Sequence, residues 1–249
     1  MPVITLLTDF GTSDSYVAEM KAVLHGAVAD LVVVDVSHAV TQGDVRSAQY
    51  LLARSWHRFP RGSVHIAVVD PGVGTERRAL AVEWQGHHFV APDNGLLTFV
   101  LTGAHVVELE IGPNAAATFH GRDVFAPAAA RLANGEALRA LGPRVVHAHL
   151  DPLPQPMKGD GRLVGQVVYV DHFGTLITNL PREAFAKTRG VRVGGEFDVQ
   201  VGRTFRDVEQ GELVAFVGSG GTVEIAARDR SATQVTGVGV GGEVSLALD

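Results

Sequence analysis

The 249-residue sequence has no cysteine, only 6% aromatic residues and no apolar run of membrane-spanning length. Without cysteine, disulfides and thiolate metal sites are excluded, and we expect a cytoplasmic location. The first residues lack a basic segment and reach a charge at Asp9, so we expect neither a signal peptide nor a membrane partner. The net charge of −6 at pH 7 offers no basic surplus, which argues against a nucleic-acid partner.

Hydrophobic residues make up 46% of the chain, and 29 residues are glycine. This composition predicts a substantial core built with many tight turns rather than long helices. The organisation changes at a proline-rich stretch, which we interpret as a linker. We therefore predict an α/β domain over residues 1–145, a linker over 146–161 and an all-β, barrel-like domain over 162–249.

In the first domain, apolar runs alternate with segments of helical periodicity. This alternation predicts a mostly parallel sheet. Asp14 is the expected N-cap of the first helix. The expected strands cover residues 3–7, 31–35, 64–69, 79–84, 88–91 and 106–111, with the fourth and fifth forming a hairpin. The expected helices begin near residue 15 and cover 44–53 and 124–133, with a short apolar helix after 92–95.

The second domain contains short β-rich runs separated by glycines and no obvious helix of any length. This pattern favours a small antiparallel sandwich or barrel. The expected strands cover residues 163–170, 176–178, 197–201, 213–217, 223–227, 235–240 and 244–248.

The loop after the third expected strand carries the strongest chemical signal. The strand ends on Asp70, and Pro71, Gly72 and Gly74 then form a tight loop. Ligands of open α/β sheets bind outside the carboxyl ends of the strands, so Asp70 lies where such sites are built. Arg77 follows closely enough to turn back toward it. An ordinary turn, with Asp70 binding loop amides, remains the alternative.

Other strand ends and loops of this domain also carry charged or titratable groups. Asp35 ends the second expected strand, and His120 and Arg122 precede a helix. A carboxylate, a guanidinium and an imidazole that converge on one cleft can hold and polarise a water molecule. Asp9 suits a ribose diol, with an Asx turn as the alternative. For His120, the alternative is a surface loop histidine or a helix cap.

Several other chemistries lack their sequence signals. His87 and His88 are adjacent in an expected strand and face opposite sides, and the other histidines lack ligand spacing, so we expect no metal. There is no dinucleotide fingerprint, P-loop or nucleophile elbow. In the second domain, the polar segment 171–179 contains Phe173, and an aromatic face among hydrogen-bonding loops suits a purine. A hairpin with a core phenylalanine is the alternative.

Taken together, the motifs resemble those of the adenosine-forming S-adenosyl-L-methionine hydrolases. This family, also called the S-adenosylmethionine hydroxide adenosyltransferases, is related to fluorinase and chlorinase. Any one motif is weak, but the ordered set covers nearly the whole chain. In chain order, the motifs are Thr8-Asp9-Phe10-Gly11, Asp14-x-Tyr16-Val17, Met20-Lys21, Asp35-Val36-Ser37-His38, Asp44-Val45-Arg46-Ser47-Ala48, Asp70-Pro-Gly-Val-Gly-Thr-x-Arg77, Pro92-Asp93-Asn94-Gly95, Phe119-His120-Gly121-Arg122-Asp123, Asp171-x-Phe173-Gly174, Thr178-Asn179 and Ser219-x-Gly221-x-Val223-Glu224-Ile225-Ala226.

The resemblance implies an N-terminal α/β domain, a C-terminal β-barrel and a homotrimer with each site between two subunits. It implies no cofactor and maps the catalytic residues of the family onto Asp70, Arg77 and His120. Asp9 matches the ribose-binding carboxylate, Asp171 and Ser219 match positions near the methionine, and Phe173 lies beside the adenine. The other implied substrate-binding positions are Asp14, Thr175, Glu224 and Ala227. The chain departs from the family pattern at Gly43, Thr175 and Gly218.

The reaction implied is hydrolysis of S-adenosyl-L-methionine to adenosine and L-methionine, with water attacking the ribose C5′. The halogenases of the family lack the Asp70, Arg77 and His120 set, so its presence favours water over halide. A halide-using synthase of 5′-halo-5′-deoxyadenosine remains one alternative. A protein that binds adenosine or S-adenosylmethionine without turnover is the other.

Overall fold

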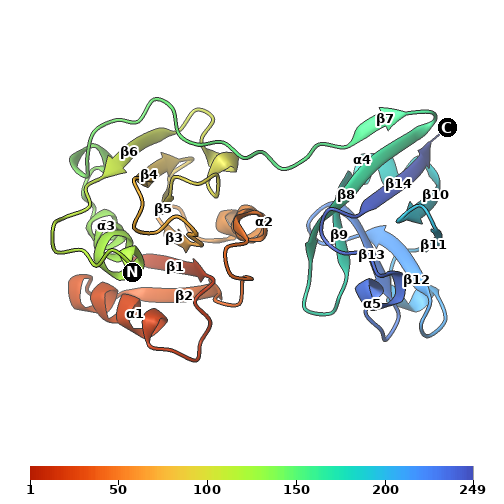
Figure 1. The fold of residues 1–249 in the computed structure, drawn as a ribbon, viewed down its shortest axis with the longest axis horizontal. Helices are drawn as coiled ribbons and strands as arrows, with labels where there is room; N and C mark the ends of the chain where they lie inside the picture. The colour runs from red at the N-terminus through yellow and green to blue at the C-terminus, as the bar shows by residue number, and fades with distance from the viewer. Residues whose placement is uncertain (249) are drawn as a thin grey trace. The chain divides into compact units, whose positions relative to one another are not determined.

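A computed structural model describes residues 1–248 and divides the chain into two compact units, Met1–Pro152 and Leu153–Asp249 (Figure 1). The division falls inside the stretch 146–161 predicted as a linker. Part of that stretch, β7 (Met157–Gly159), pairs with the following strand.

The first unit is built on a six-stranded sheet in the order β2-β1-β3-β5-β4-β6. The strands β2, β1, β3 and β5 are parallel, whereas β4 runs antiparallel to both of its neighbours. The prediction of an α/β domain with a mostly parallel sheet is confirmed. The strands are β1 (Val3–Thr8), β2 (Val32–Ser37), β3 (Val64–Val68), β4 (Ala79–Trp84), β5 (His87–Pro92) and β6 (His105–Leu109).

Helices cover both faces of this sheet. Met20 and Phe125 belong to a core cluster with Ile4 and Ile66, whereas Leu52 packs with Phe89 in a second cluster. The α-helices are α1 (Tyr16–Ala27), α2 (Val45–Ser55) and α3 (Ala126–Ala133). The shorter turns are 3-10 helices at Trp56–Arg58, Thr98–Val100 and Leu138–Ala140, and a π-helix at Gly121–Phe125 that leads into α3.

The strand order creates a switch point between β1 and β3. The chain leaves β1 for β2 on one side and returns through α2 to β3 on the other side of β1. Ligands of open α/β sheets bind where the carboxyl ends of two such strands diverge. The ends of β1 and β3 carry Asp9 and Asp70, so the fold brings these carboxylates to neighbouring positions.

The second unit is a closed seven-stranded β-barrel. Its strands follow the order β14-β10-β11-β12-β13-β9-β8, and β14 pairs with β8 to close the ring. The predicted barrel-like domain is confirmed. The barrel strands are β8 (Arg162–Val170), β9 (Leu176–Pro181), β10 (Thr188–Val193), β11 (Phe197–Val201), β12 (Leu213–Val217), β13 (Thr222–Ala227) and β14 (Glu243–Leu248). Short helices α4 (Arg182–Phe185), α5 (Ala232–Thr236) and a 3-10 turn (Phe205–Asp207) lie between them.

Two predictions in the barrel were wrong. The segment 235–240 is not a strand, because Ser231 caps α5 by accepting from the Gln234 amide and Gly237 ends the helix at φ +69°. The strand β10 was missed. Gly190 and Arg192 alternate with Val191 and Val193, which belong to the barrel core, and Arg189 lies at a register shift, so the run does not look apolar.

Three details of the first unit also differ from the prediction. Ser15, not Asp14, occupies the N-cap position of α1, and its hydroxyl donates to Glu19 instead of capping the helix. The strand β2 does not end at Asp35 but continues to Ser37. After Gly95 there is only the short 3-10 turn Thr98–Val100, since the segment before it is held in turns.

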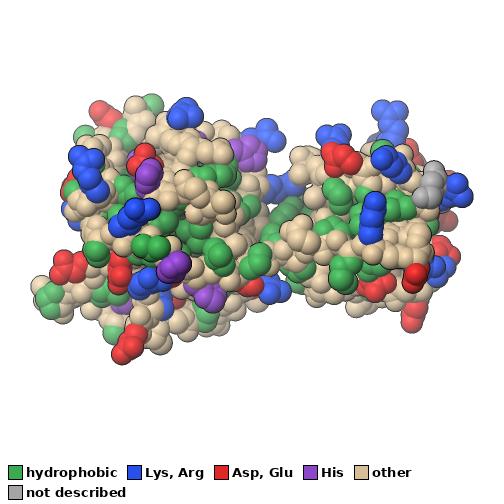
Figure 2. All heavy atoms as spheres, turned by 90° about the horizontal axis from the view of Figure 1, so that it is seen from above, with side chains coloured by type: hydrophobic (Ala, Val, Ile, Leu, Met, Phe, Trp, Pro, Cys, Tyr) green, Lys and Arg blue, Asp and Glu red, His purple; other side chains and the backbone are tan. Residues whose placement is uncertain are grey.

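Charged side chains of both signs are interspersed on the face drawn in Figure 2. No helix within residues 1–248 has both the length and the apolar character needed to cross a bilayer.

Candidate active site

The loop that follows β3 is held in a defined shape by its own hydrogen bonds. The Asn94 side chain donates to the Val69 carbonyl at 2.8 Å and fixes the end of the strand. The Thr75 hydroxyl donates to the Gly72 carbonyl at 2.7 Å and closes the turn. Gly74 has φ +79°, and a Cβ there would lie 2.8 Å from the Ala117 carbonyl oxygen. Glycine is therefore required both by the conformation and by the close approach.

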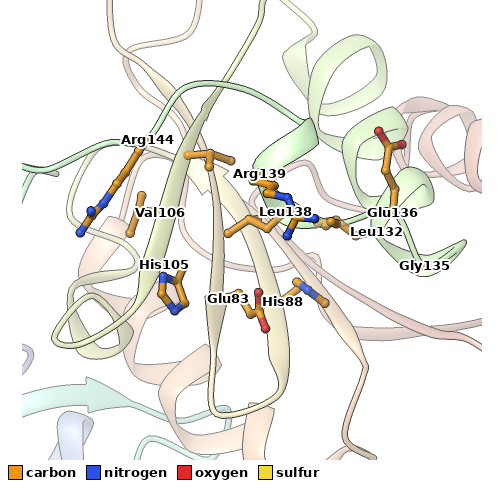
Figure 3. A pocket seen from close by; sticks show the side chains of 12 residues that line it. Glu83, His88, His105, Val106, Leu132, Gly135, Glu136, Leu138, Arg139 and Arg144 are labelled. Atoms are coloured by element: carbon orange, nitrogen blue, oxygen red, sulfur yellow. The ribbon is translucent and has the colours of Figure 1, made fainter.

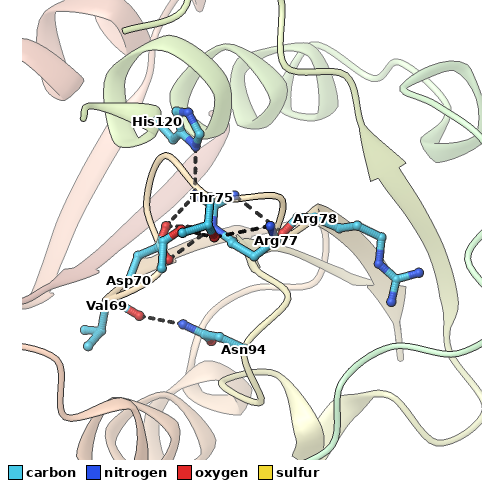
Figure 4. Close-up of polar contacts among 8 residues, drawn as sticks. Val69, Asp70, Thr75, Arg77, Arg78, Asn94 and His120 are labelled. Carbon is cyan, nitrogen blue, oxygen red and sulfur yellow. Dashed lines mark hydrogen bonds and ion pairs between the residues drawn. The ribbon is translucent and has the colours of Figure 1, made fainter. Parts of the chain in front are cut away.

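Asp70, Arg77 and His120 form one cluster at this loop (Figure 4). The Nε atom of Arg77 donates to both carboxylate oxygens of Asp70, at 3.1 and 2.9 Å, and Nη2 also contacts Oδ2. The same Nη2 lies 2.8 Å from Nδ1 of His120. The structure thus brings together, from the β3 loop and the start of the π-helix, the three residues expected to be catalytic.

The cluster is shielded from solvent. The Arg77 and Asp70 side chains are only 9% and 4% exposed, and His120 is buried. Burial and the neighbouring Arg77 charge lower the pKa of His120, so its imidazole is neutral at pH 7. Arg77 can only donate, and the contact therefore assigns the lone pair to Nδ1 and the hydrogen of His120 to Nε2.

Asp9 lies beside this cluster at the end of β1. Thr8 and Val68 are paired across β1 and β3, which places the two strand ends next to each other. The Gly43 amide donates to Oδ2 of Asp9 at 2.8 Å. Asp14 is exposed in the turn before α1.

Two other groups expected to converge on the cleft are engaged elsewhere. Asp35 forms an ion pair with Lys21 at 2.6 Å. Arg122 forms ion pairs with Glu19 and Asp123 and lies over the Phe119 ring, with its charge 4.8 Å from the ring centroid. Neither joins Asp70 and Arg77 in the contacts of the described residues.

In the barrel, Asp171 organises the turn between β8 and β9. Its Oδ1 accepts from the Phe173 amide at 3.0 Å and from the Thr175 amide at 2.8 Å. This turn leaves the Phe173 ring 76% exposed while it buries Thr175. Phe173 is therefore presented to solvent rather than packed in the core, which removes the core-phenylalanine alternative.

Ser219, Glu224 and Ala227 lie along the neighbouring hairpin. Ser219 is in the β12–β13 turn, and the Glu224 carboxylate lies against Gly218, where a Cβ would come within 1.8 Å of Oε1. The β9–β13 ladder pairs Leu176 with Ile225 at one end and Pro181 with Thr222 at the other.

The ends of that ladder are three residues apart along β13, about 10 Å, because the register shifts between Thr222 and Glu224. Ser219 lies beyond the Thr222 end, in the turn whose Gly221 carbonyl accepts from the Arg182 amide of α4. Asp171 lies beyond the Leu176 end, in the turn whose Gly174 carbonyl accepts from the Thr233 amide of α5. Ala227 is at the Asp171 end. Within one barrel, the two positions expected beside the methionine are thus at opposite ends of the ladder.

One cavity lies away from the cluster. It measures about 550 Å³ and is lined by Glu83, His88, His105 and residues around α3 (Figure 3). These three residues are at the ends of β4, β5 and β6 that point away from the Asp70 loop. A second cavity of about 440 Å³ borders Thr75, Arg77 and Ile111. Of these two cavities, the second adjoins the Asp70, Arg77 and His120 cluster through Arg77.

Within residues 1–248 there is no group of three or more His, Asp or Glu side chains arranged to hold a metal ion. His87 instead lies 3.2 Å from Nε2 of His65, whose Nδ1 contacts the Thr5 hydroxyl at 2.8 Å. Burial, followed by the nearby His87 and His88, lowers the pKa of His65 to about 3.

The structure also shows contacts of two residues to which the sequence analysis assigned no role. Asn94 fixes the end of the strand that bears Asp70. His38 contacts the Thr8 hydroxyl at 2.8 Å, next to Asp9. Both residues stand in motifs of the resemblance, which was the available signal, but their partners are distant in sequence.

Comparison with known proteins follows the same division of the chain. The SAM hydroxide adenosyltransferase N-terminal domain matches residues 4–142, and the C-terminal domain of that family matches residues 165–245. The chain belongs to the SAM hydroxide adenosyltransferase family.

Relatives of this chain include a Thermus thermophilus protein named (R)-S-adenosyl-L-methionine hydrolase. It is 42% identical over 99% of this chain and 100% of its own length. A fluorinase from Actinopolyspora mzabensis is more distant, at 28% identity over 90% of each chain. A crystal structure of an uncharacterized conserved protein from Thermotoga maritima is 36% identical, with a TM-score of 0.91 over 98% of this chain and 99% of that one.

Proposed function

We propose that this protein hydrolyses S-adenosyl-L-methionine to adenosine and L-methionine. The observation that carries the proposal is the Arg77 guanidinium held between the Asp70 carboxylate and the His120 imidazole at the switch point of the sheet. A buried cation beside a carboxylate suits a water molecule that becomes hydroxide-like as it reacts. The family membership and the names of the relatives support the same reaction.

In the proposed mechanism, water attacks C5′ in line with the C5′–S bond. The C5′–O bond forms, the C5′–S bond breaks, and its electron pair neutralises the sulfonium to the thioether of methionine. The sulfonium is already a good leaving group, so no cofactor and no general acid are needed there. Asp70, Arg77 and His120 align the water and stabilise its developing negative charge.

We assign the proton of the attacking water to Asp70. The Nδ1 lone pair of His120 is occupied by Arg77, and Nε2 carries hydrogen in this tautomer, so the neutral ring has no free acceptor. His120 instead orients the water by donating from Nε2. The proton then passes to solvent. The charge balances, because the sulfonium cation and water give adenosine, methionine and one proton.

The substrate we propose is the (R)-sulfonium epimer, because the curated relatives carry that epimer in their names. A sulfonium with three different substituents is a stereocentre, and only one epimer directs the C5′–S bond opposite a fixed water. Separate incubation of each epimer tests this assignment: faster consumption of the (S) form contradicts it.

Chromatography of S-adenosylmethionine incubated with the protein in halide-free buffer tests the reaction itself. Equal amounts of adenosine and methionine, absent with Asp70→Asn, support hydrolysis. Intact, tightly bound S-adenosylmethionine instead supports a binding protein. Formation of a 5′-halo-5′-deoxyadenosine that depends on added chloride or fluoride supports the halogenase alternative.

We further propose a cytoplasmic homotrimer in which the first unit of one subunit and the barrel of the next form each site. The resemblance to the family supports this assembly, and the cysteine-free composition is compatible with the location. The shared site is tested with two inactive variants, Asp70→Asn and Phe173→Ala, which are mixed, dissociated and reassembled. Recovered activity requires sites shared between subunits, whereas sites within one chain give none.

A further inference from the structure

The His38 side chain links the end of β1 to Asp35 on β2. Its ring is buried, and Nδ1 lies 2.8 Å from the Thr8 hydroxyl, which is itself fully buried at the last position of β1. On the other side, Nε2 lies 3.0 Å from Oδ1 of Asp35, whose second oxygen pairs with Lys21, but the His38–Asp35 contact lacks hydrogen-bond geometry. The carboxylate, imidazole and hydroxyl therefore lie in series, and the contact between His38 and Thr8 is the hydrogen bond among them.

A β-bulge makes this series possible. Leu6 pairs with Asp35, but Leu7 pairs with Ser37, so Val36 is an extra residue in β2. In a regular strand, residues three apart face opposite sides of the sheet. The extra residue reorients the chain, and Asp35 can then contact His38, three positions later. Bulges of this kind often redirect side chains beside functional sites.

The same histidine fixes both neighbours of Asp9. The Thr8 hydroxyl, which contacts the ring of His38, also accepts from the Phe10 amide at 3.2 Å. The His38 carbonyl accepts from the Gly11 amide at 2.8 Å. The segment from Thr8 to Gly11 is thus tied to one buried residue through both its side chain and its backbone.

One tautomer of His38, with the ring hydrogen on Nε2, suits the contacts with both Thr8 and Asp35. The Thr8 hydroxyl donates to Nδ1 of His38, which leaves its oxygen free to accept from the Phe10 amide. The hydrogen of the ring is then on Nε2, facing Asp35. Removing the Thr8 hydroxyl leaves Nδ1 and the Phe10 amide without their partner in a buried site, which is more costly than losing an exposed contact.

We propose that His38 is a positioning residue for substrate binding, which holds the Thr8–Gly11 segment so that Asp9 can accept hydrogen bonds from the ribose hydroxyls. This role rests on the proposed function, because that function places a ribose at Asp9. His38 does not touch the substrate. It acts through Thr8 and through the backbone of the loop, and its loss weakens binding of the nucleoside more than the chemical step.

The test compares Thr8→Val, which removes the hydroxyl at nearly constant shape, with Thr8→Ser, which keeps it. His38→Asn retains an acceptor near the Nδ1 position, and His38→Leu does not. His87→Asn is the matched control, since His87 is a buried histidine that contacts another side chain remote from Asp9. Each variant is measured for its melting temperature, its kcat and KM for S-adenosylmethionine, and its Kd for adenosine.

We expect Thr8→Val and His38→Leu to raise KM and the adenosine Kd about fivefold to tenfold, the usual effect of one buried hydrogen bond. The kcat at saturating substrate stays within about twofold, and Thr8→Ser and His38→Asn recover most of the affinity. His87→Asn lowers the melting temperature comparably but leaves KM unchanged. A purely structural role predicts equal behaviour of the Thr8, His38 and His87 variants.

Unchanged KM and Kd in Thr8→Val overturn the positioning role, as does a fall in kcat alone. The proposed function is judged separately, by turnover of S-adenosylmethionine in the wild-type protein. A wild-type protein that binds adenosine without turnover refutes hydrolysis. The adenosine Kd of Thr8→Val then still decides the role of His38.

Discussion

Replacing Arg77 with methionine tests how much the cluster depends on a buried charge. The change keeps most of the apolar volume and removes the cation that pairs with Asp70, whose side chain is only 4% exposed. Removing one partner of a buried ion pair costs about 3–5 kcal/mol, because the remaining charge is left without compensation. For a chain of this size, we expect the melting temperature to fall by roughly 6–20 °C.

Activity falls independently of this loss of stability. Removing one donor that stabilises a developing oxyanion typically lowers kcat by about 10²–10³. Calorimetry and initial rates on Arg77→Met measure the two effects separately. The double variant Asp70→Asn/Arg77→Met buries no charge at these positions, so we expect it to regain more than half of the lost melting temperature but none of the activity.

Arg46→Met is the matched control for this experiment. Its ion pair with Asp151 is largely open to solvent, with side chains 52% and 34% exposed. Such pairs contribute about 0–1 kcal/mol, and the melting temperature should change by less than about 4 °C. If Arg77→Met melts like Arg46→Met, or the double variant is no more stable than Arg77→Met, the argument from the buried charge is refuted.

Three further predictions concern pH and the catalytic loop. The pKa of His65 is lowered on folding from about 6.5 to about 3, so the free energy of unfolding falls as the pH drops below 6.5. The loss at pH 5 is about 2 kcal/mol. Thermal melts should therefore show that His65→Gln is less acid-sensitive than the wild type. Protonation of His120 breaks its contact with Arg77, so kcat should fall only at pH values below its lowered pKa, and His120→Asn should lose this acid limb. Gly74→Ala should lower both kcat and melting temperature more than Gly103→Ala, because both glycines have φ near +75° but only Gly74 would bring a Cβ into contact with a backbone oxygen.

Much of the first unit could be predicted because its signals are local. Buried parallel strands are continuous apolar runs, and the run before Asp70 ends in residues that force a turn. Arg77 follows Asp70 by seven residues, and the same turn brings the two side chains into contact. His120 was harder, because its contact with Arg77 spans 43 residues and depends on how the π-helix is placed against β3.

The parts that were mispredicted or missed depend on long-range pairing. Asp35 looked like a cleft residue, but a single extra residue in β2 directs it toward Lys21 and His38. The barrel strand β10 was hidden because Arg189, Gly190 and Arg192 interrupt its apolar residues. None of these facts is contained in a short window of sequence.

The pairing of β14 with β8 has a consequence for the order in which the protein forms. Glu243 pairs with Gln166, so a hydrogen-bonded seam joins residues made at very different times during translation. β14 also pairs with β10, and without it both β8 and β10 would expose an open edge. Exposed strand edges favour association with other chains. The nascent barrel therefore remains vulnerable to aggregation until β14 has been synthesised, whereas all six strands of the first unit's sheet are made once β6 is complete.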